Sequence, residues 1–283
     1  MAKIIAVLHD KGGVAKTTTV MNLGTALWLL KKKVLLIDAD KQHSLTSVLD
    51  STVLTENDGT LYEWMHGRLD SAPIYERYAG LDYIPSCTSM ANLDVELAAM
   101  RAREYKLRKL LLPIKDNYDY VLIDCEPGCQ TLINQNVLSV ADYVIIPTKA
   151  DSQCFAGISS VVSSIGMVKA DLNDSLQIYG FLITDYDCRE RESRIFREMA
   201  KDKSVMHADT FPVPIRHCSK AKEAYSLEKS VYEHDAKCSA ADDYMMLAER
   251  IIGRKARPKN WTPEQWGAIS NESFEKFIKL RDL

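Results

Sequence analysis

Residues 9–19 read His-Asp-Lys-Gly-Gly-Val-Ala-Lys-Thr-Thr-Thr, and the rest of the chain is arranged around this stretch. An apolar run of strand length, residues 3–8, precedes it, and residues 20–30 follow with leucines at helical spacing. A turn that contains glycine therefore joins a buried strand to the start of a helix. A helix start presents unpaired N–H groups, and glycines let the backbone approach an anion closely. The turn therefore predicts a phosphate site.

Two side chains of this turn suit a bound nucleotide. Lys16 can reach the β- and γ-phosphates, and the Thr17 hydroxyl can bind Mg²⁺. The stretch departs from the common phosphate-loop pattern, because Asp10 and Ala15 stand where that pattern has glycines. A second lysine, Lys11, precedes Lys16 in the same turn. The residues expected to surround the phosphates are Lys11, Gly12, Gly13, Val14, Ala15, Lys16, Thr17 and Thr18.

Three aspartates follow apolar runs of strand length. Residues 34–37 lead into Asp38 and Asp40, and residues 120–123 lead into Asp124. Carboxylates at the carboxyl edge of a parallel sheet face the ligand crevice. At such an edge Asp124 can hold Mg²⁺ through its water shell, as the second conserved motif of phosphate-loop enzymes does.

Strand-like and helix-like segments alternate along the chain. This alternation predicts an α/β fold, a doubly wound and mostly parallel sheet with helices on both faces. Residues 92–112 carry leucines along one stripe and predict one long helix, and residues 211–216 predict an edge strand interrupted by prolines. Further strands are predicted at residues 81–84, 143–148 and 176–184, and further helices at residues 44–49, 130–140, 152–170, 195–200 and 240–252.

Composition narrows the class of protein. A chain of 283 residues with 46% hydrophobic residues can form one large core. The net charge of −3 gives no general sign of nucleic-acid binding. The seven cysteines are scattered and form no C-x-x-C pair, which fits reduced thiols better than disulfides or a zinc site. Neither a leader nor a membrane span is expected, so the predicted location is the cytoplasm.

The string Lys-Gly-Gly-x-x-Lys-Thr-Thr resembles the deviant Walker A motif of the ParA/MinD family, and three further motifs follow it in the order seen in that family. The resemblance covers roughly residues 3–252 and is closest to ParA/Soj-type DNA-partitioning ATPases. It implies a P-loop ATPase domain over residues 1–253. Residues 254–283 would then form a basic linker and a helical C-terminal extension.

The resemblance also implies roles for individual residues. Lys11 would cross a dimer interface to the partner's phosphates, and Asp40 would position the attacking water, so that Lys11, Lys16 and Asp40 form the catalytic set. The implied ligands of Mg²⁺ are Thr17, Asp38 and Asp124, and the backbone near Pro212 and Pro214 would pack against the adenine.

Two positions near the carboxylates depart from the family pattern. Lys41 stands where the family usually has proline. The family commonly has a small residue and then Pro-Pro where this chain reads Cys125-Glu126-Pro127. Glu126, together with Ala15 in the phosphate turn, supports a nucleotide-binding scaffold without hydrolysis as an alternative.

The implied function is an ATP- and Mg²⁺-dependent homodimer that binds non-specific double-stranded DNA on the nucleoid. A ParB-like centromere-binding protein would stimulate hydrolysis. A MinD-like regulator of division on a membrane is the alternative, although acidic residues in the extension weigh against a membrane surface. Basic clusters neutralise phosphates without reading sequence. The basic residues assigned to DNA are Arg189, Arg191, Arg194, Arg216, Lys220, Arg254, Lys255 and Arg257.

Overall fold

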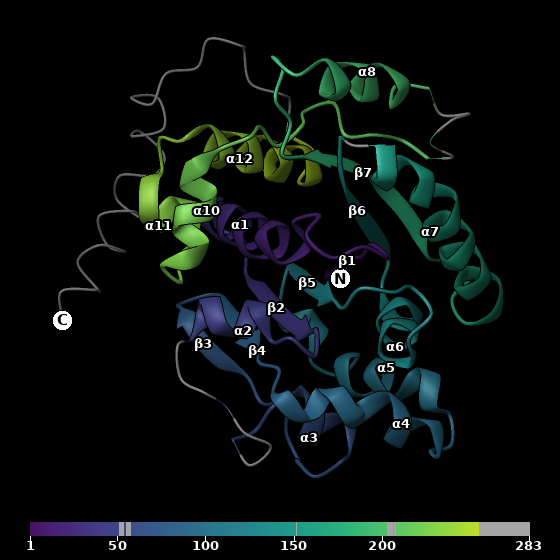
Figure 1. Ribbon diagram of the computed structural model, residues 1–283. Helices are drawn as coiled ribbons and strands as arrows, with labels where there is room; N and C mark the ends of the chain where they lie inside the picture. The colour runs from purple at the N-terminus through teal and green to yellow at the C-terminus, as the bar shows by residue number, and fades with distance from the viewer. Residues whose placement is uncertain (51–53, 55–57, 151, 203–205, 207, 255–283) are drawn as a thin grey trace.

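The computed structural model describes residues 1–50, 54, 58–150, 152–202, 206 and 208–254 (Figure 1). In this part a seven-stranded sheet has the order β3-β4-β2-β5-β1-β6-β7. The pair β3–β4 is antiparallel and the other pairs are parallel, which confirms the predicted fold class. The strands are β1 (Lys3–Val7), β2 (Val34–Ala39), β3 (Tyr75–Tyr78), β4 (Leu81–Ile84), β5 (Tyr120–Cys125), β6 (Tyr143–Lys149) and β7 (Gln177–Thr184).

Helices cover both faces of the sheet (Figure 1). One layer consists of α1 (Lys16–Leu29), α2 (Ser44–Leu49), α10 (Ser219–Ser226), α11 (Val231–Asp235) and α12 (Ser239–Ile251). The other consists of α3 (Leu61–Met65), α4 (Leu93–Ala98), α5 (Lys106–Leu111), α6 (Leu132–Val140), α7 (Ser152–Asp171) and α8 (Arg191–Met199). Short 3₁₀ helices are η1 (Thr88–Asn92), η2 (Arg103–Tyr105) and η3 (Lys115–Asn117).

The two hydrophobic cores lie on opposite faces of the central strands. In β1, Ile5 and Val7 pack with α1 and α12, whereas Ile4 and Ala6 belong to the core under α6 and α7. A strand buried on both faces reads as a continuous apolar run, which is why these strands were predictable from the sequence. None of the described helices has the length and apolar character that crossing a bilayer requires.

The long helix predicted over residues 92–112 is wrong. The segment forms α4 and α5, separated by η2 and by Ala102 in a left-handed conformation (φ 47°). The buried amide of Asn136 on α6 explains the break. Its Nδ2 donates to the carbonyl of Arg103 (2.7 Å), and its Oδ1 accepts from the N–H of Leu107 (3.1 Å). These two bonds satisfy the start of α5 from outside the helix.

The edges of the sheet also differ from expectation. Strand β3 carries little apolar alternation and was not predicted. Residues 211–216 form no strand: the isolated bridges Phe181–Thr210 and Tyr186–Arg216 stand at either end of this stretch, and within it the N–H groups of Phe211 and Ile215 donate to carbonyls of β7. Proline has no N–H to donate to a ladder, so Pro212 and Pro214 interrupt the pairing.

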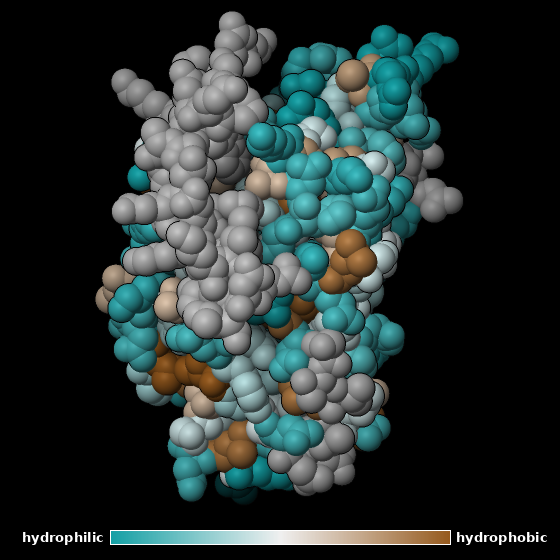
Figure 2. Space-filling model, turned by 90° about the vertical axis from the view of Figure 1, so that its left-hand side faces the viewer, coloured by the Kyte–Doolittle hydropathy of each residue, from teal (hydrophilic) through white to brown (hydrophobic). Residues whose placement is uncertain are grey.

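On the part of the surface that Figure 2 shows in colour, hydrophobic side chains occupy only small areas. Figure 2 shows the face on the side of α11, where hydrophilic residues dominate and the hydrophobic areas are separate from one another. Scattered apolar side chains of this kind are normal for a folded chain.

Candidate active site

The turn between β1 and α1 has the conformation of a phosphate loop. Gly13 and Ala15 both have left-handed backbones, with φ of 73° and 70°. The Lys16 Nζ donates to the carbonyl of Lys11 (3.2 Å), so the lysine folds back along the turn. The Thr184 hydroxyl donates to the carbonyl of Val14 (3.1 Å) and fixes the turn to β7. The first N–H groups of α1 are thereby presented at its N-terminus.

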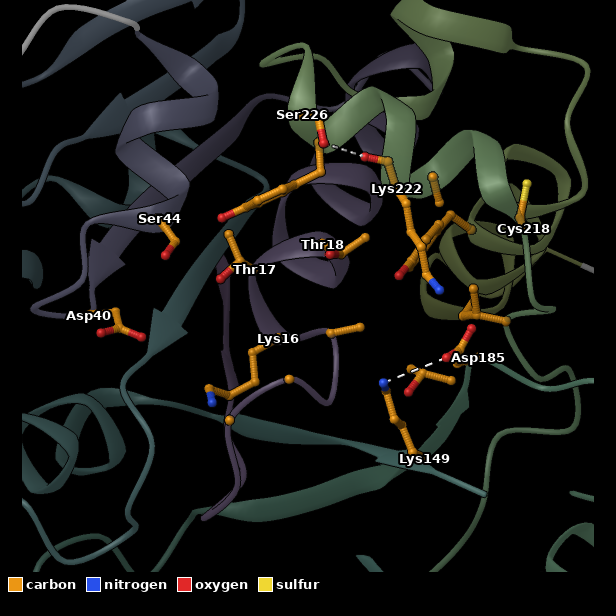
Figure 3. A pocket seen from close by; sticks show the side chains of 18 of the residues that line it. Lys16, Thr17, Thr18, Asp40, Ser44, Lys149, Asp185, Cys218, Lys222 and Ser226 are labelled. Carbon is orange, nitrogen blue, oxygen red and sulfur yellow. Dashed lines mark hydrogen bonds and ion pairs between the residues drawn. The ribbon is translucent and has the colours of Figure 1, made fainter. Parts of the chain in front are cut away.

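A cavity of about 540 Å³ opens next to this turn at the carboxyl ends of the parallel strands (Figure 3). This is the edge at which ligands bind in open α/β sheets, and the volume suits a small molecule such as a nucleotide. The lining combines the phosphate turn with residues of α10 and α12. It includes Gly12, Gly13, Ala15, Lys16, Thr17, Thr18, Asp40, Gln42, Ser44, Pro127, Lys149, Thr184, Asp185, Ile215, Arg216, Cys218, Lys222, Tyr225, Ser226 and Tyr244.

Asp38 organises the loop that follows β2. Its Oδ2 accepts hydrogen bonds from the N–H and the hydroxyl of Thr46 (2.8 and 2.7 Å), and its Oδ1 accepts from the N–H of Asp40 (3.1 Å). Burial raises the pKa of Asp38 to about 6, against the opposing effect of the Thr46 hydrogen bonds. Both oxygens thus already have protein donors.

Asp124 lies opposite Asp38 on the adjacent strand. Burial, and then the charge of Asp38, raise the pKa of Asp124 well above its usual value, whereas the nearby Thr17 hydroxyl and Lys16 lower it. Within the described chain neither carboxylate oxygen has a well-formed hydrogen bond. Two buried carboxylates and a hydroxyl at one place fit a divalent cation, because a cation would offset the charge that burial penalises.

Mg²⁺ in nucleotide sites uses few protein ligands. It is usually held by one or two carboxylates plus phosphates and waters. No group of three or more His, Cys, Asp or Glu side chains suited to a metal occurs among the described residues, and the Asp38–Asp124 pair with Thr17 matches the smaller set.

Asp40 is fixed at the edge of the cavity. Its Oδ1 accepts from the N–H of Gln42 (2.8 Å), and its carbonyl accepts from the Ser86 hydroxyl (2.8 Å). Asp40 lines the cavity, whereas Asp38 and Asp124 are buried and are not among the lining residues. The carboxylate of Asp40 is therefore the one that can face a reacting group.

The other end of the cavity holds a charged cluster that was not predicted. Asp185 pairs with Lys149 (Oδ2 to Nζ, 3.6 Å; Figure 3) and with His217 (Oδ1 to Nδ1, 2.7 Å). Burial raises the pKa of Asp185, but the hydrogen bond from His217 and the charge of Lys149 outweigh it and the net pKa is lowered. Asp185 also has a left-handed backbone (φ 56°). The adjacency of β6 and β7 brings Lys149 to Asp185, and the bridge between Tyr186 and Arg216 brings His217 there.

Some predicted nucleotide ligands lie away from the cavity lining. Pro212 and Pro214 are not among the lining residues, but Ile215 and Arg216, which follow them, are. Lys11 and Val14 do not line it either, although the Lys11 carbonyl accepts from Lys16.

The basic residues assigned to DNA lie on three separate segments. Arg189, Arg191 and Arg194 are exposed at and before the start of α8, and Arg254 is exposed after α12. Arg216 instead forms an ion pair with the buried Asp243 (Nη2 to Oδ1, 2.7 Å). Lys220 pairs with Glu223 (2.8 Å) on α10, and Lys255 and Arg257 lie outside the described residues.

Comparison with known proteins places this chain in a family. A family model described as an AAA domain matches residues 2–178. The chromosome partitioning protein ParA of Caulobacter vibrioides is 34% identical over 258 residues, covering 89% of this chain and 95% of that protein. The sporulation initiation inhibitor protein Soj of Bacillus subtilis is 32% identical over 255 residues, with coverages of 89% and 98%. Cobyrinic acid a,c-diamide synthase from Mycobacterium smegmatis, solved with an ATP analogue and magnesium, has a TM-score of 0.78 and 26% identity, covering 92% of this chain and all of that one.

Proposed function

The chain belongs to the ParA/Soj family of partitioning ATPases, and we propose that it hydrolyses ATP in the cavity beside the phosphate turn and uses the ATP-bound state to partition DNA. One observation carries the proposal. Lys16 and Thr17 begin α1 at the same sheet edge where β2 and β5 deliver Asp40 and the buried Asp38–Asp124 pair. A turn that carries a lysine suited to phosphate thus lies beside a pair of carboxylates suited to a cation.

The residues of the site divide the work of phosphoryl transfer. Lys16 and the N–H groups at the start of α1 would stabilise the charge on the phosphates. Asp38, Asp124 and Thr17 would hold Mg²⁺, which would neutralise charge on the phosphate oxygens when bound. Asp40, fixed by Gln42 and Ser86, would orient the attacking water. Such catalysis consists mainly of positioning and charge stabilisation.

The ATP state would join two copies of the chain. Lys11 would reach the partner's phosphates, so the nucleotide would hold the pair together. The paired protein would bind non-specific double-stranded DNA through its exposed arginines, which places it on the nucleoid in the cytoplasm. A ParB-like centromere-binding protein would stimulate hydrolysis and release the DNA. Support comes from the family relation and from the exposure of Arg189, Arg191 and Arg194.

The test compares three purified proteins: wild type, Lys16→Ala and Asp40→Ala. Lys16→Ala is expected to weaken ATP binding about 100-fold, because it removes a charged hydrogen bond to phosphate. Asp40→Ala is expected to bind ATP normally but to hydrolyse it about 100-fold more slowly. Isothermal titration and a phosphate-release assay give the two readouts.

The controls are Lys169→Ala and Asp171→Ala, which remove exposed side chains at the end of α7 and should change neither readout. Unchanged hydrolysis in Asp40→Ala would remove Asp40 from the mechanism. Co-sedimentation with DNA and with liposomes, each with ATP, then separates DNA partitioning from a membrane role.

A further inference from the structure

An ion pair connects the two loops that flank the carboxylate end of the cavity. The Lys41 Nζ lies 3.5 Å from Oε2 of Glu126. The Lys41 side chain is 48% exposed, whereas that of Glu126 is 4% exposed. Both residues stand at positions where the sequence departs from the family pattern. The two departures therefore contact each other across the site.

Each partner is adjacent in sequence to a residue that lines the cavity. Lys41 follows Asp40, and Glu126 precedes Pro127, and both of these neighbours are lining residues. Neither Lys41 nor Glu126 lines the cavity itself. The backbone therefore links the pair directly to two lining residues, Asp40 and Pro127.

The loop that carries Glu126 is fixed on its own side of the site. The Asn134 Nδ2 on α6 donates to the carbonyls of Glu126 (3.0 Å) and Gly128 (2.6 Å). The N–H of Cys129 donates to Oδ1 of Asp10 in the phosphate turn (2.7 Å). The loop after β5 is thus attached to the phosphate turn and to α6, and the ion pair attaches it to the loop after β2.

The charge of Glu126 requires a partner. A buried carboxylate without a cation costs considerable free energy, and Lys41 supplies the cation here. Asp94, another nearby carboxylate, has the same charge as Glu126 and accepts from the N–H groups of Leu132 and Ile133 at the start of α6, so it adds to the need for a cation at Glu126. Removing Lys41 therefore leaves the buried Glu126 without its cation, whereas removing the charge of Glu126 leaves the half-exposed Lys41 to water and abolishes the contact between the two loops.

We propose that Lys41 and Glu126 are positioning residues for ATP hydrolysis, holding the loops after β2 and β5 at the spacing that aligns Asp40 with the attacking water. The proposal rests on the proposed function of the site. The proposal requires that the pair affect the rate of the chemical step. The affinity for ATP would depend on the phosphate turn.

The experiment measures kcat, KM for ATP and thermal stability for Lys41→Met, Glu126→Gln and the double variant. Each single variant should lower kcat about tenfold with KM changed less than about twofold, since an interaction needed only in the transition state affects kcat and leaves substrate binding unchanged. The double variant should lose no more activity than the worse single one. Lys41→Arg, which keeps the pair, should retain most of the activity.

The matched control is the Lys201–Glu198 pair, whose side chains are 65% and 69% exposed. Lys201→Met and Glu198→Gln should leave kcat unchanged. Multiplicative losses in the Lys41/Glu126 double variant, or lower stability with normal kcat in the singles, would overturn the positioning role. If Glu126→Gln does not fold, the comparison of Lys41→Met with Lys41→Arg decides instead, and kcat of Lys41→Met should again be about tenfold lower. If the wild-type protein does not hydrolyse ATP, both the proposed function and this inference are refuted. If the wild-type protein is active and the variants have the same kcat, only the inference is refuted.

Discussion

Ala15 shows how a single residue can conflict with its backbone. It adopts φ 70° directly before α1, a conformation that costs a residue with a Cβ about 1–2 kcal/mol relative to the right-handed region. The common phosphate-loop pattern has glycine here. The sequence predicted the turn and its role in binding phosphate. It did not predict that Ala15, which replaces a glycine, still adopts a positive φ. Only the backbone dihedral reveals the strain.

We predict that Ala15→Gly raises the free energy of unfolding by about 0.5–1 kcal/mol, the relieved strain less the added freedom of the unfolded chain. Gly13→Ala is the matched reverse change. A Cβ at Gly13 would meet nothing within 4 Å, so its effect comes from the backbone alone (φ 73°) and should be a loss of about 1 kcal/mol. Urea unfolding of the ligand-free proteins measures both. Shifts of the same sign in the two variants would contradict the strain argument.

The elements that the sequence predicted well are those whose patterns arise from burial on both faces. Strands β1, β2 and β5 read as apolar runs that end in functional residues, so the phosphate turn, Asp40 and Asp124 could be placed at one edge. The prediction of one helix over residues 92–112 was wrong, although most of the leucines of this segment do face the core. The side chain of Asn136 forms hydrogen bonds with the backbone of Arg103 and Leu107, at the point where the helix is interrupted. Spacing of apolar residues does not report a polar side chain that arrives from another helix.

Cys218 lies between the starts of two helices. It precedes α10 and lines the cavity. Burial tends to raise the pKa of its thiol, but hydrogen bonds from the N–H of Ala240 and the hydroxyl of Ser239, at the start of α12, outweigh burial, and the pKa is lowered. Burial instead raises the pKa of Cys238 to about 11. A lowered thiol pKa means more thiolate near neutral pH, and the thiolate is the reactive form.

We therefore predict that iodoacetamide at pH 7.5 modifies Cys218 much faster than Cys238, and that the Cys218 reaction persists as the pH falls below the usual thiol pKa. Saturating ATP should protect Cys218, because a ligand in the cavity would cover it. The exposed Cys188 is the internal control and should react equally with and without ATP. Peptide mass mapping gives the rates. Equal labelling of Cys218 in the two conditions would place the nucleotide elsewhere.

On the scale of the whole molecule, the phosphate end of the site was predictable and the opposite end was not. The contact of Lys149 with Asp185 depends on the adjacency of β6 and β7, and that of His217 with Asp185 depends on the isolated bridge between Tyr186 and Arg216. Pro212 and Pro214, near which an adenine contact is predicted, do not line the cavity, whereas Ile215 and Arg216, which follow them, do. An irregular segment gives no periodicity from which its inward-facing residues could be assigned.

Pairing of two molecules provides the test at this scale. We predict that Lys11→Ala changes the ATP affinity of the single chain less than about threefold, since Lys11 is half-buried and does not line the cavity of its own chain, yet abolishes ATP-dependent dimers. Light scattering with a non-hydrolysable analogue measures the mass. Lys33→Ala, at the opposite edge of the sheet where β2 begins, is the control and should dimerise as wild type does. A Lys11→Ala protein that still doubles its mass would exclude a nucleotide shared between two lysines.

The cavity lining begins at Gly12 and ends at Tyr244. During synthesis the lining residues of the phosphate turn leave the ribosome when most of the chain is still untranslated. The lining residues of α10 and α12 leave it last. A truncated product that ends before α10 would carry the phosphate turn but lack the side that encloses a nucleotide. We expect such a product to lack an enclosed nucleotide site, whereas a product that ends after α12 would keep every lining residue.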